Sequence, residues 1–178
     1  MTAVSRLGRQ ISELTAMLGN IGARYALIGG LALAPHHVIR ATQDVDLLVD
    51  LENADAIERE LTALGYRSIH RSEEAANCLR GDERVDFIYA HRPTAKRLLA
   101  GARTLVTSLG ELRVISGEGL IGFKLQGIAN DPRRTQDLED IRALLRANRG
   151  RLDMAEVREY FRLFDREPLL NDLLRELD

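Results

Sequence analysis

Two carboxylates one residue apart in an otherwise apolar segment constrain this chain more than any other feature. Residues 44–49 read Asp-Val-Asp-Leu-Leu-Val. Successive side chains of a β-strand point to opposite faces, so an extended segment buries its odd-numbered apolar residues on one face and places Asp44 and Asp46 together on the other. Two carboxylates one pleat apart repel each other unless a cation lies between them. The pattern therefore predicts a strand over residues 45–49 that carries a cation site.

A divalent metal ion that prefers oxygen ligands fits this pair of acids. The chain has one cysteine and four histidines, and none of them adjoins Asp44 or Asp46. Carboxylate oxygens are then the available donors, and they favour Mg²⁺ or Mn²⁺ over zinc. The alternative is that both acids are solvated strand residues neutralised by Arg40. Arg40 and Thr42 also occupy even positions, where they either hold phosphate oxygens or balance the charge of the acids.

A third acid lies in a later apolar segment. Asp86 alternates with Val85, Phe87 and Tyr89, so in a strand it faces away from that apolar set. Three carboxylates can hold a pair of metal ions that activates an attacking oxygen and stabilises the leaving oxygen of a phosphoryl displacement. The neighbouring acids at 82 and 83 compete for this role, and an outward-facing solvated acid is the alternative.

A glycine pair follows the first short apolar run. Residues 25–28 are apolar or aromatic and lead into Gly29 and Gly30, after which residues 31–37 are expected to form a helix. Glycines at such a turn let backbone N–H groups approach a phosphate closely. A glycine pair is also common in a plain turn, and the chain contains neither a P-loop nor a GxGxxG pattern.

The order of these features resembles the signature of the DNA polymerase beta nucleotidyltransferase superfamily. That signature is an apolar residue, Gly-Gly or Gly-Ser, a short gap, and Asp-x-Asp or Asp-x-Glu between apolar residues, as in residues 28–30 and 44–47 here. The resemblance extends over residues 24–145. The Gly-Gly-Leu-Ala of residues 29–32 and the Arg-x-Thr-x-Asp-Val-Asp-Leu of residues 40–47 look most like the AbiEii-type nucleotidyltransferases, many of which are toxins of bacterial toxin-antitoxin pairs.

The resemblance implies transfer of a nucleoside monophosphate from an NTP to a hydroxyl acceptor. In that case Asp44, Asp46 and Asp86 are the catalytic metal ligands, for Mg²⁺ or Mn²⁺, and Gly29 and Gly30 hold phosphates. The implied acceptor is a tRNA 3′ end, a protein hydroxyl or a small molecule such as an aminoglycoside or lincosamide antibiotic. A toxin role implies an antitoxin partner. The alternative is a non-catalytic nucleotide-binding or antitoxin-like module of the same fold, against which the three intact acids argue.

Two expected helices carry further charged groups. Lys124 and Asp137 each lie on the apolar face of a helix, so we expect them to meet. The family has a downstream Lys and a Lys-Asp-x-x-Asp helix, to which Lys124 and residues 136–140 correspond, with Gln136 in place of the usual lysine. The resemblance gives Lys124 a contact with the triphosphate and lets Asp137 orient Lys124 or the sugar. A structural ion pair, or a lysine with only its stem buried, is the alternative.

The expected fold is α+β, with a small mixed β-sheet flanked by helices. Residues 1–116 are expected to form a nucleotidyltransferase sheet domain, and residues 117–178 a helical region packed on it, with the nucleotide cleft between them. The expected helices are residues 5–19, 31–37, 53–64, 95–100, 117–129, 133–147, 153–164 and 167–177. The expected strands are residues 25–28, 45–49, 66–69, 77–80, 84–89 and 113–115.

Composition limits the remaining classes. The chain of 178 residues is 45% hydrophobic and 29% charged, which suits one globular domain with a helical appendage. Its 25 Lys and Arg against 27 Asp and Glu give a net charge of −2, so a wide nucleic-acid footprint is disfavoured. No apolar run reaches membrane-span length and no signal pattern begins the chain, so we expect a cytoplasmic protein with no membrane partner. A leucine stripe over residues 169–177 leaves the oligomeric state open.

Overall fold

The computed structural model describes residues 5–177, which group into two compact units. The sheet unit contains the residues up to Leu31 together with Ala41–Ile115, and the helical unit contains Ala32–Arg40 together with the residues from Ser116 onward. The chain therefore passes between the units three times. The short segment Ala32–Arg40 belongs with helices that follow it by some eighty residues in the sequence.

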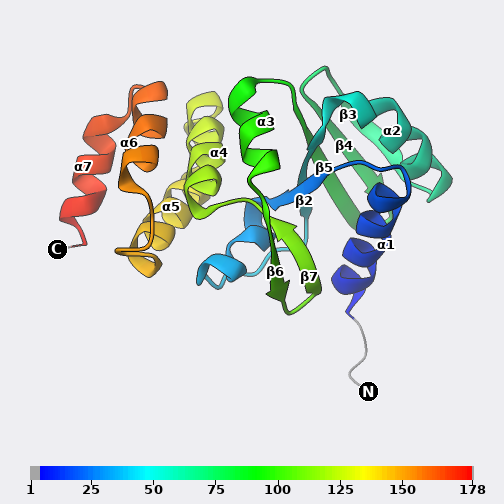
Figure 1. Cartoon of the computed structure of the whole chain (residues 1–178), viewed down its shortest axis with the longest axis horizontal. Helices are drawn as coiled ribbons and strands as arrows, with labels where there is room; N and C mark the ends of the chain where they lie inside the picture. Colours follow the sequence, from blue (N-terminus) through cyan, green and yellow to red (C-terminus); the bar gives the residue numbers. More distant parts are fainter. Residues whose placement is uncertain (1–4, 178) are drawn as a thin grey trace. The chain divides into compact units, whose positions relative to one another are not determined.

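The sheet unit is built on a mixed sheet, as expected. Within residues 5–177, seven strands pair in the order β3-β4-β5-β2-β1-β7-β6 (Figure 1). β2 runs parallel to β5 and β1 runs parallel to β7, whereas the other neighbouring pairs are antiparallel. The strands are β1 (Tyr25–Ile28), β2 (Val45–Asp50), β3 (Arg67–Arg71), β4 (Ala75–Arg80), β5 (Glu83–Ala90), β6 (Arg103–Thr107) and β7 (Gly110–Val114).

The apolar alternation of the two central strands forms the core of this unit. β2 and β5 are aligned so that Val45 pairs with Val85 and Val49 with Tyr89, and these odd-numbered side chains are buried on one face. Fully burying an aliphatic or aromatic side chain contributes about 1.5–3 kcal/mol each, so this face holds the register of the two strands. Three helices complete the unit, namely α1 (Arg6–Asn20), α2 (Ala54–Ala63) and α3 (Pro93–Ala100).

The segment between β1 and β2 differs from the expected structure. A helix over residues 31–37 was expected, but the chain forms two 3₁₀ turns, Gly29–Ala32 (η1) and Ala34–His36 (η2). Pro35 lacks an N–H and disfavours helical backbone in the residue before it, and His37 has a φ of 65°, which ends the turn. Residues 38–44 have no regular structure, so the pleat expected to align Arg40 and Thr42 with the two acids begins only at Val45.

The helical unit has its helices where the periodicity predicts them. α4 contacts α5 and α6, and α6 contacts α7 (Figure 1). Ser116 caps α4 by accepting a hydrogen bond from the Gly119 N–H at 3.1 Å, and Asp153 caps α6 by accepting from Ala155 and Glu156. The Tyr160 ring lies against Gly122, where an added Cβ would come within 3.1 Å of the ring. These helices are α4 (Gly117–Asn130), α5 (Thr135–Ala147), α6 (Met154–Leu163) and α7 (Glu167–Arg175).

One short 3₁₀ turn remains to be described. The turn η3 (Leu51–Asn53) joins β2 to α2. The strand β6 was missed by the sequence analysis, because its alternation is broken by exposed residues such as Val106. Among the helices of residues 5–177, none combines the length and the apolar character needed to cross a membrane.

Candidate active site

Strand register brings two of the predicted acids side by side. β2 and β5 are neighbours in the sheet, and Asp46 pairs directly with Asp86. Parallel neighbours lie about 4.8 Å apart, and residues in register point to the same face. Both side chains are half-buried on the face opposite the apolar alternation, whereas Asp44 is exposed at the end of the irregular segment, directly before β2 begins at Val45. The fold therefore places Asp46 and Asp86 in register on one face, and the alignment of Asp44 with them stays a prediction.

Gly29 lies directly against the Asp46 carboxylate. β1 pairs antiparallel with β2 so that Ile28 lies opposite Asp46, and the next residue is Gly29 with a φ of 67°. A Cβ added at Gly29 would lie 2.1 Å from Asp46 Oδ2 and 2.6 Å from Asp46 Cγ. No side chain fits in that space, so glycine is required both by the backbone conformation and by the close approach of the carboxylate. The expected turn at Gly29 and the buried Gly30 is confirmed, and its role in holding phosphates stays a prediction.

Arg84 lies on the same face as the acids and was missed by the sequence analysis. Its Nε donates to both oxygens of Asp86 at 3.2 Å, and Asn77 Nδ2 donates to Asp86 Oδ1 at 2.7 Å. The hydrogen bond to Asp86 and the negative charges of Asp86, Asp44 and Asp46 raise the pKa of Arg84, despite partial burial. One guanidinium thus lies within electrostatic reach of all three carboxylates. Its two-residue spacing from Asp86 was the signal that could have revealed it.

The donor set fits a hard divalent cation, although the side chains do not converge as they stand. Carboxylates are the ligands that Mg²⁺ and Mn²⁺ prefer. One side of the Asp46 carboxylate lies directly against the backbone of Gly29, with no side chain between them. Across residues 5–177, no three His, Cys, Asp or Glu side chains gather around a point that could hold a metal ion. Asp86 is instead turned toward Arg84 and Asn77. For Asp86 to bind a metal ion together with Asp46, its carboxylate would have to release Arg84.

A second charged cluster lies in the helical unit. Lys124 is only 5% exposed, and its Nζ donates to Asp137 Oδ1 at 3.1 Å and to Asp140 Oδ2 at 2.6 Å. The predicted meeting of Lys124 and Asp137 is confirmed. Asp140 was not predicted as a member, although its position one helical turn after Gln136 and three residues after Asp137 places it on the same helix face.

Arg40 belongs to this cluster. Its Nε and one terminal nitrogen donate to the two oxygens of Asp140, each at 3.0 Å, in a bidentate pair. Gln136, the residue that departs from the family lysine, donates to Asp140 at 3.0 Å. Arg40 thus forms a bidentate pair with Asp140, and Arg84 supplies positive charge beside Asp86, while the interpretation that Arg40 also neutralises Asp44 and Asp46 stays an alternative.

The charges of the cluster keep the Asp140 carboxylate ionised. Burial by itself would raise the pKa of Asp140, but hydrogen bonds and charge from Lys124, with further hydrogen bonds from Gln136 and Arg40, lower it below its usual value. A buried ionised group is costly unless every donor and acceptor is satisfied. Asp140 meets this condition through three donor residues.

Asp137 keeps one buried oxygen without a hydrogen bond. Arg134 Nε lies 2.6 Å from Asp137 Oδ2 as an ion pair, but outside hydrogen-bond direction, and no donor in residues 5–177 satisfies that oxygen. A Cβ added at Gly127 would lie 2.8 Å from the same atom, so a glycine admits the carboxylate here too. Buried acceptors in proteins are nearly always paired, so this oxygen is a candidate ligand contact.

Thr42 is half-buried within the irregular segment before β2.

Comparison with known proteins identifies the fold. No model of a protein family matches the sequence, and no curated protein matches it. The solution structure of the antibiotic-resistance factor ANT(2'')-Ia superposes with a TM-score of 0.69 at 17% identity, covering 99% of this chain and 100% of that chain. The lincomycin-bound lincosamide antibiotic adenylyltransferase LnuA has a TM-score of 0.56 at 16% identity, covering 79% of this chain and 96% of that chain.

A third solved structure has the same fold. The antigenic nucleotidyltransferase-like protein from Paracoccidioides brasiliensis has a TM-score of 0.59 at 19% identity, covering 95% of this chain and 92% of that chain. The chain thus has the α+β nucleotidyltransferase fold that the sequence resemblance implied. At 16–19% sequence identity, the similarity to these solved structures establishes the shared fold. It does not distinguish the AbiEii type from other proteins with this fold.

Proposed function

We propose that this protein is a metal-dependent nucleotidyltransferase that moves a nucleoside monophosphate from an NTP to a hydroxyl group. The observation that carries the proposal is the register of β2 and β5, which pairs Asp46 with Asp86 on one face, while Asp44 directly precedes β2 in the sequence. This arrangement occurs within a nucleotidyltransferase fold. In the reaction the acceptor oxygen forms a bond to the α-phosphorus, the bond from that phosphorus to the bridging oxygen breaks, and pyrophosphate leaves with the electron pair.

Asp44, Asp46 and Asp86 would hold Mg²⁺ or Mn²⁺. The bound ion lowers the barrier by stabilising negative charge on the attacking and leaving oxygens. Gly29 keeps the Asp46 carboxylate in place, because no side chain separates it from the β1 turn. Asp86 accepts the proton of the acceptor hydroxyl once Arg84 has left it. Arg84 then remains beside the site as a cation for the phosphates.

The charged cluster around Lys124 and Asp137 would bind the nucleotide in this proposal. Lys124 and Arg40 would offset negative charge on the triphosphate, together with the hydroxyl of Thr42. Asp137 would orient Lys124 through Oδ1 and accept a hydrogen bond from the sugar at Oδ2, the buried oxygen without a donor. Gly29 and Gly30 would offer backbone N–H groups to the phosphates. The alternative is a purely structural cluster of buried ion pairs.

A small molecule with several hydroxyl groups is the acceptor we favour. ANT(2'')-Ia has been solved with adenylyl-2''-tobramycin, and LnuA with lincomycin. The net charge of −2 lacks the basic excess typical of proteins that cover a large RNA surface. A tRNA 3′ end or a protein hydroxyl is the alternative acceptor. A toxin role with an antitoxin partner would belong with those alternatives.

The test is a transfer assay with each α-labelled NTP and Mg²⁺. The acceptors are a panel of aminoglycosides and lincosamides, total bacterial RNA and total protein, and the Asp46→Asn and Asp82→Asn variants run alongside. We expect label on a small molecule with the natural chain and with Asp82→Asn, an exposed acid of the turn before β5, and none with Asp46→Asn. Label on RNA or protein would replace the acceptor assignment. Magnesium-dependent NTP binding without transfer to any acceptor would favour a non-catalytic nucleotide-binding or antitoxin-like module.

A further inference from the structure

A cavity of about 300 Å³ opens in the sheet unit at the start of β1. Its wall comes from the C-terminal half of α1, the residues that lead into β1, the last residue of α3, and Arg113 of β7. Its volume lies at the lower end of the range for small-molecule sites, about 300–1,000 Å³. Tyr25 lines the cavity and begins β1, whereas Ile28, which pairs with Asp46, ends it. The cavity and the Asp46 carboxylate therefore lie at opposite ends of this strand.

The wall of the cavity carries positive charge. Arg24 and Arg113 both line it, and within residues 5–177 no Asp or Glu does. Arg24 is neutralised by Asp50, which accepts from its Nε at 3.0 Å and from a terminal nitrogen at 2.6 Å. Arg113 has no carboxylate partner in that part of the chain. One unpaired guanidinium thus determines the charge of the cavity.

Arg113 holds more donors than its surroundings satisfy. A guanidinium has five N–H groups in one plane. One terminal nitrogen of Arg113 donates to the Ala102 carbonyl at 2.9 Å, which holds the group beside the cavity. Its Nε is buried and has no acceptor among the residues that the structure describes. Because buried N–H groups in proteins are nearly always paired, the unmatched Nε is a second sign, besides the charge, that an acceptor belongs here.

Tyr25 offers a further donor. Its hydroxyl accepts from the backbone N–H of Arg113 at 3.3 Å. The proton of this hydroxyl has no acceptor in residues 5–177, and a phenol can donate while it accepts. The Tyr25 ring, Ala23 and Ala100 make the rest of the wall largely apolar. The cavity therefore combines donors for one acidic group with room for a small apolar body.

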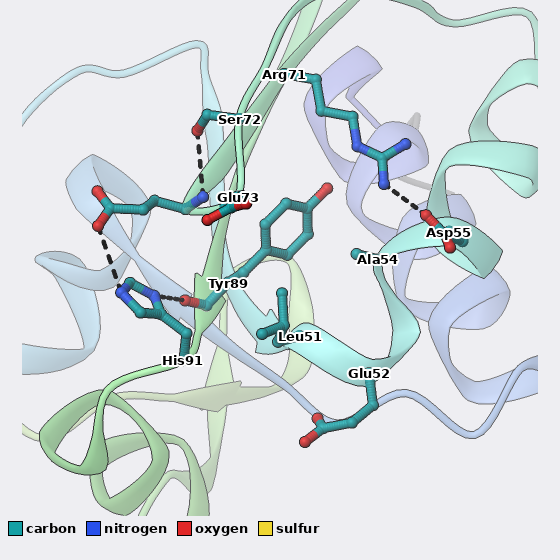
Figure 2. Close-up of a pocket in the computed structure, with 10 residues that line it drawn as sticks. Leu51, Glu52, Ala54, Asp55, Arg71, Ser72, Glu73, Tyr89 and His91 are labelled. Carbon is teal, nitrogen blue, oxygen red and sulfur yellow. Dashed lines mark hydrogen bonds and ion pairs between the residues drawn. The ribbon is translucent and has the colours of Figure 1, made fainter.

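The larger hollow of the sheet unit, beside Tyr89, differs in its charges (Figure 2). Figure 2 shows the Arg71 guanidinium against the Asp55 carboxylate. Glu74, on the same rim, is paired with Arg92 at 3.1 Å. These charges already have partners within the protein, in contrast to Arg113. The smaller cavity is therefore the one whose charge a ligand would balance.

We propose that the cavity beside Arg113 binds a small organic carboxylate. An arginine and a carboxylate form two parallel N–H···O bonds, and Nε supplies one of them once the guanidinium rotates toward the cavity. The Tyr25 hydroxyl donates a third, and the apolar body of the ligand lies against Ala23 and Ala100. One unpaired guanidinium balances the single charge of a carboxylate, whereas a phosphomonoester carries about −1.5 to −2 at neutral pH.

Sodium benzoate titrated into the full chain labelled with ¹⁵N-arginine tests the proposal by NMR. Benzamide has the same shape without the charge and is the ligand control. We expect benzoate, and not benzamide, to shift one Nε–H resonance saturably, and we expect that resonance to be missing in Arg113→Lys. Affinity in the variants is measured from the benzoate resonances.

Three variants separate the proposed contacts from a general effect of charge. Arg113→Lys keeps the charge but loses the planar donor pair, so binding should weaken at least about fivefold. Tyr25→Phe keeps the ring and should weaken binding about threefold, through loss of one hydrogen bond. Arg103→Gln removes an exposed arginine of the neighbouring strand β6 and should bind benzoate as the natural chain does.

Several results would overturn the proposal. These are the absence of a saturable shift at tens of millimolar benzoate, an equal shift with benzamide, and an equal weakening in Arg103→Gln. Tighter binding of methyl phosphate than of benzoate would overturn the assignment to a carboxylate. None of these measurements involves nucleotide transfer, so a failure here is distinct from a failure of the proposed enzyme activity.

Discussion

At the scale of single residues, Gly29 should be the least replaceable glycine of the chain. Gly29→Ala places a Cβ against the Asp46 carboxylate and forces a side chain into φ 67°. Gly22 has nearly the same φ, 69°, but an added Cβ there meets nothing within 4 Å. We expect Gly22→Ala to cost about 1 kcal/mol of unfolding free energy from backbone strain and to retain activity. Gly29→Ala should cost more and lose transfer activity.

The comparison of these two variants by urea unfolding and transfer assay separates strain from displacement of Asp46. If Gly22→Ala and Gly29→Ala had equal stability and equal activity, Gly29 would not be needed to admit the Asp46 carboxylate. A loss of activity in Gly22→Ala alone would do so as well.

Arg84 should compete with metal ions for Asp86. In Arg84→Gln the carboxylates lose a neighbouring cation, so without metal the protein should be destabilised slightly, by at most about 0.5 kcal/mol, because this pair is partly exposed. Magnesium should then raise the melting temperature of Arg84→Gln more than that of the natural chain. Arg103→Gln, an exposed arginine of β6, is the control and should respond to magnesium as the natural chain does. A smaller magnesium response in Arg84→Gln would count against the competition.

At the scale of elements, the pairing of α4 with α5 depends on the ionised state of Asp140. The pKa of Asp140 is lowered in the folded state, so its stabilising contribution is present above the unfolded value of about 3.9 and is lost as pH falls toward the folded value. We expect the free energy of unfolding to fall below about pH 4, and this acid-dependent part to disappear in Asp140→Asn.

Asp140→Asn should also be less stable at neutral pH, by about 3 kcal/mol, because Lys124 and Arg40 lose a buried partner. Denaturant unfolding from pH 3 to pH 7 measures both effects. Glu139→Gln, on the exposed side of the same helix, is the control for a general loss of negative charge. If Asp140→Asn kept the stability of the natural chain at pH 7, the cluster would not be the link between these helices.

The elements themselves were largely predictable, and the reasons differ from one to another. The helices of residues 135–175 show a clear apolar period, and the odd-numbered apolar residues of β2 and β5 are buried, so local pattern and tertiary burial agree. The helix expected over residues 31–37 was wrong because Pro35 and the left-handed His37 outweigh the apolar pattern there. β6 was missed because an exposed edge strand needs no strict alternation.

The members of the candidate site were only partly predictable. Alternation predicts which face Asp46 and Asp86 occupy, but only strand order and register bring them to one another. The partner of Arg40 lies a hundred residues away in the sequence, so no local pattern could indicate Asp140. Arg84 was open to prediction from its spacing to Asp86. The close approach of Gly29 to Asp46 follows from three-dimensional packing and from nothing in the local sequence.

At the scale of the whole molecule, charge should limit contact with nucleic acid. With 25 basic and 27 acidic residues, the chain has no excess of cations to release counterions from phosphates. We expect tRNA to be poorly retained in a filter-binding assay at physiological salt, with a shallow dependence on salt concentration. Tight binding with a steep salt dependence would show that basic side chains gather locally, and it would favour tRNA as the acceptor.

The most direct test of the central claim is a crystal structure of the chain with Mn²⁺ and a non-hydrolysable NTP analogue. The account predicts an anomalous manganese signal within ligand distance of both Asp46 and Asp86, with Arg84 no longer hydrogen-bonded to Asp86. If nucleotide were bound while Asp86 stayed on Arg84 and no manganese contacted Asp46, the proposed metal-dependent transfer by these acids would be contradicted.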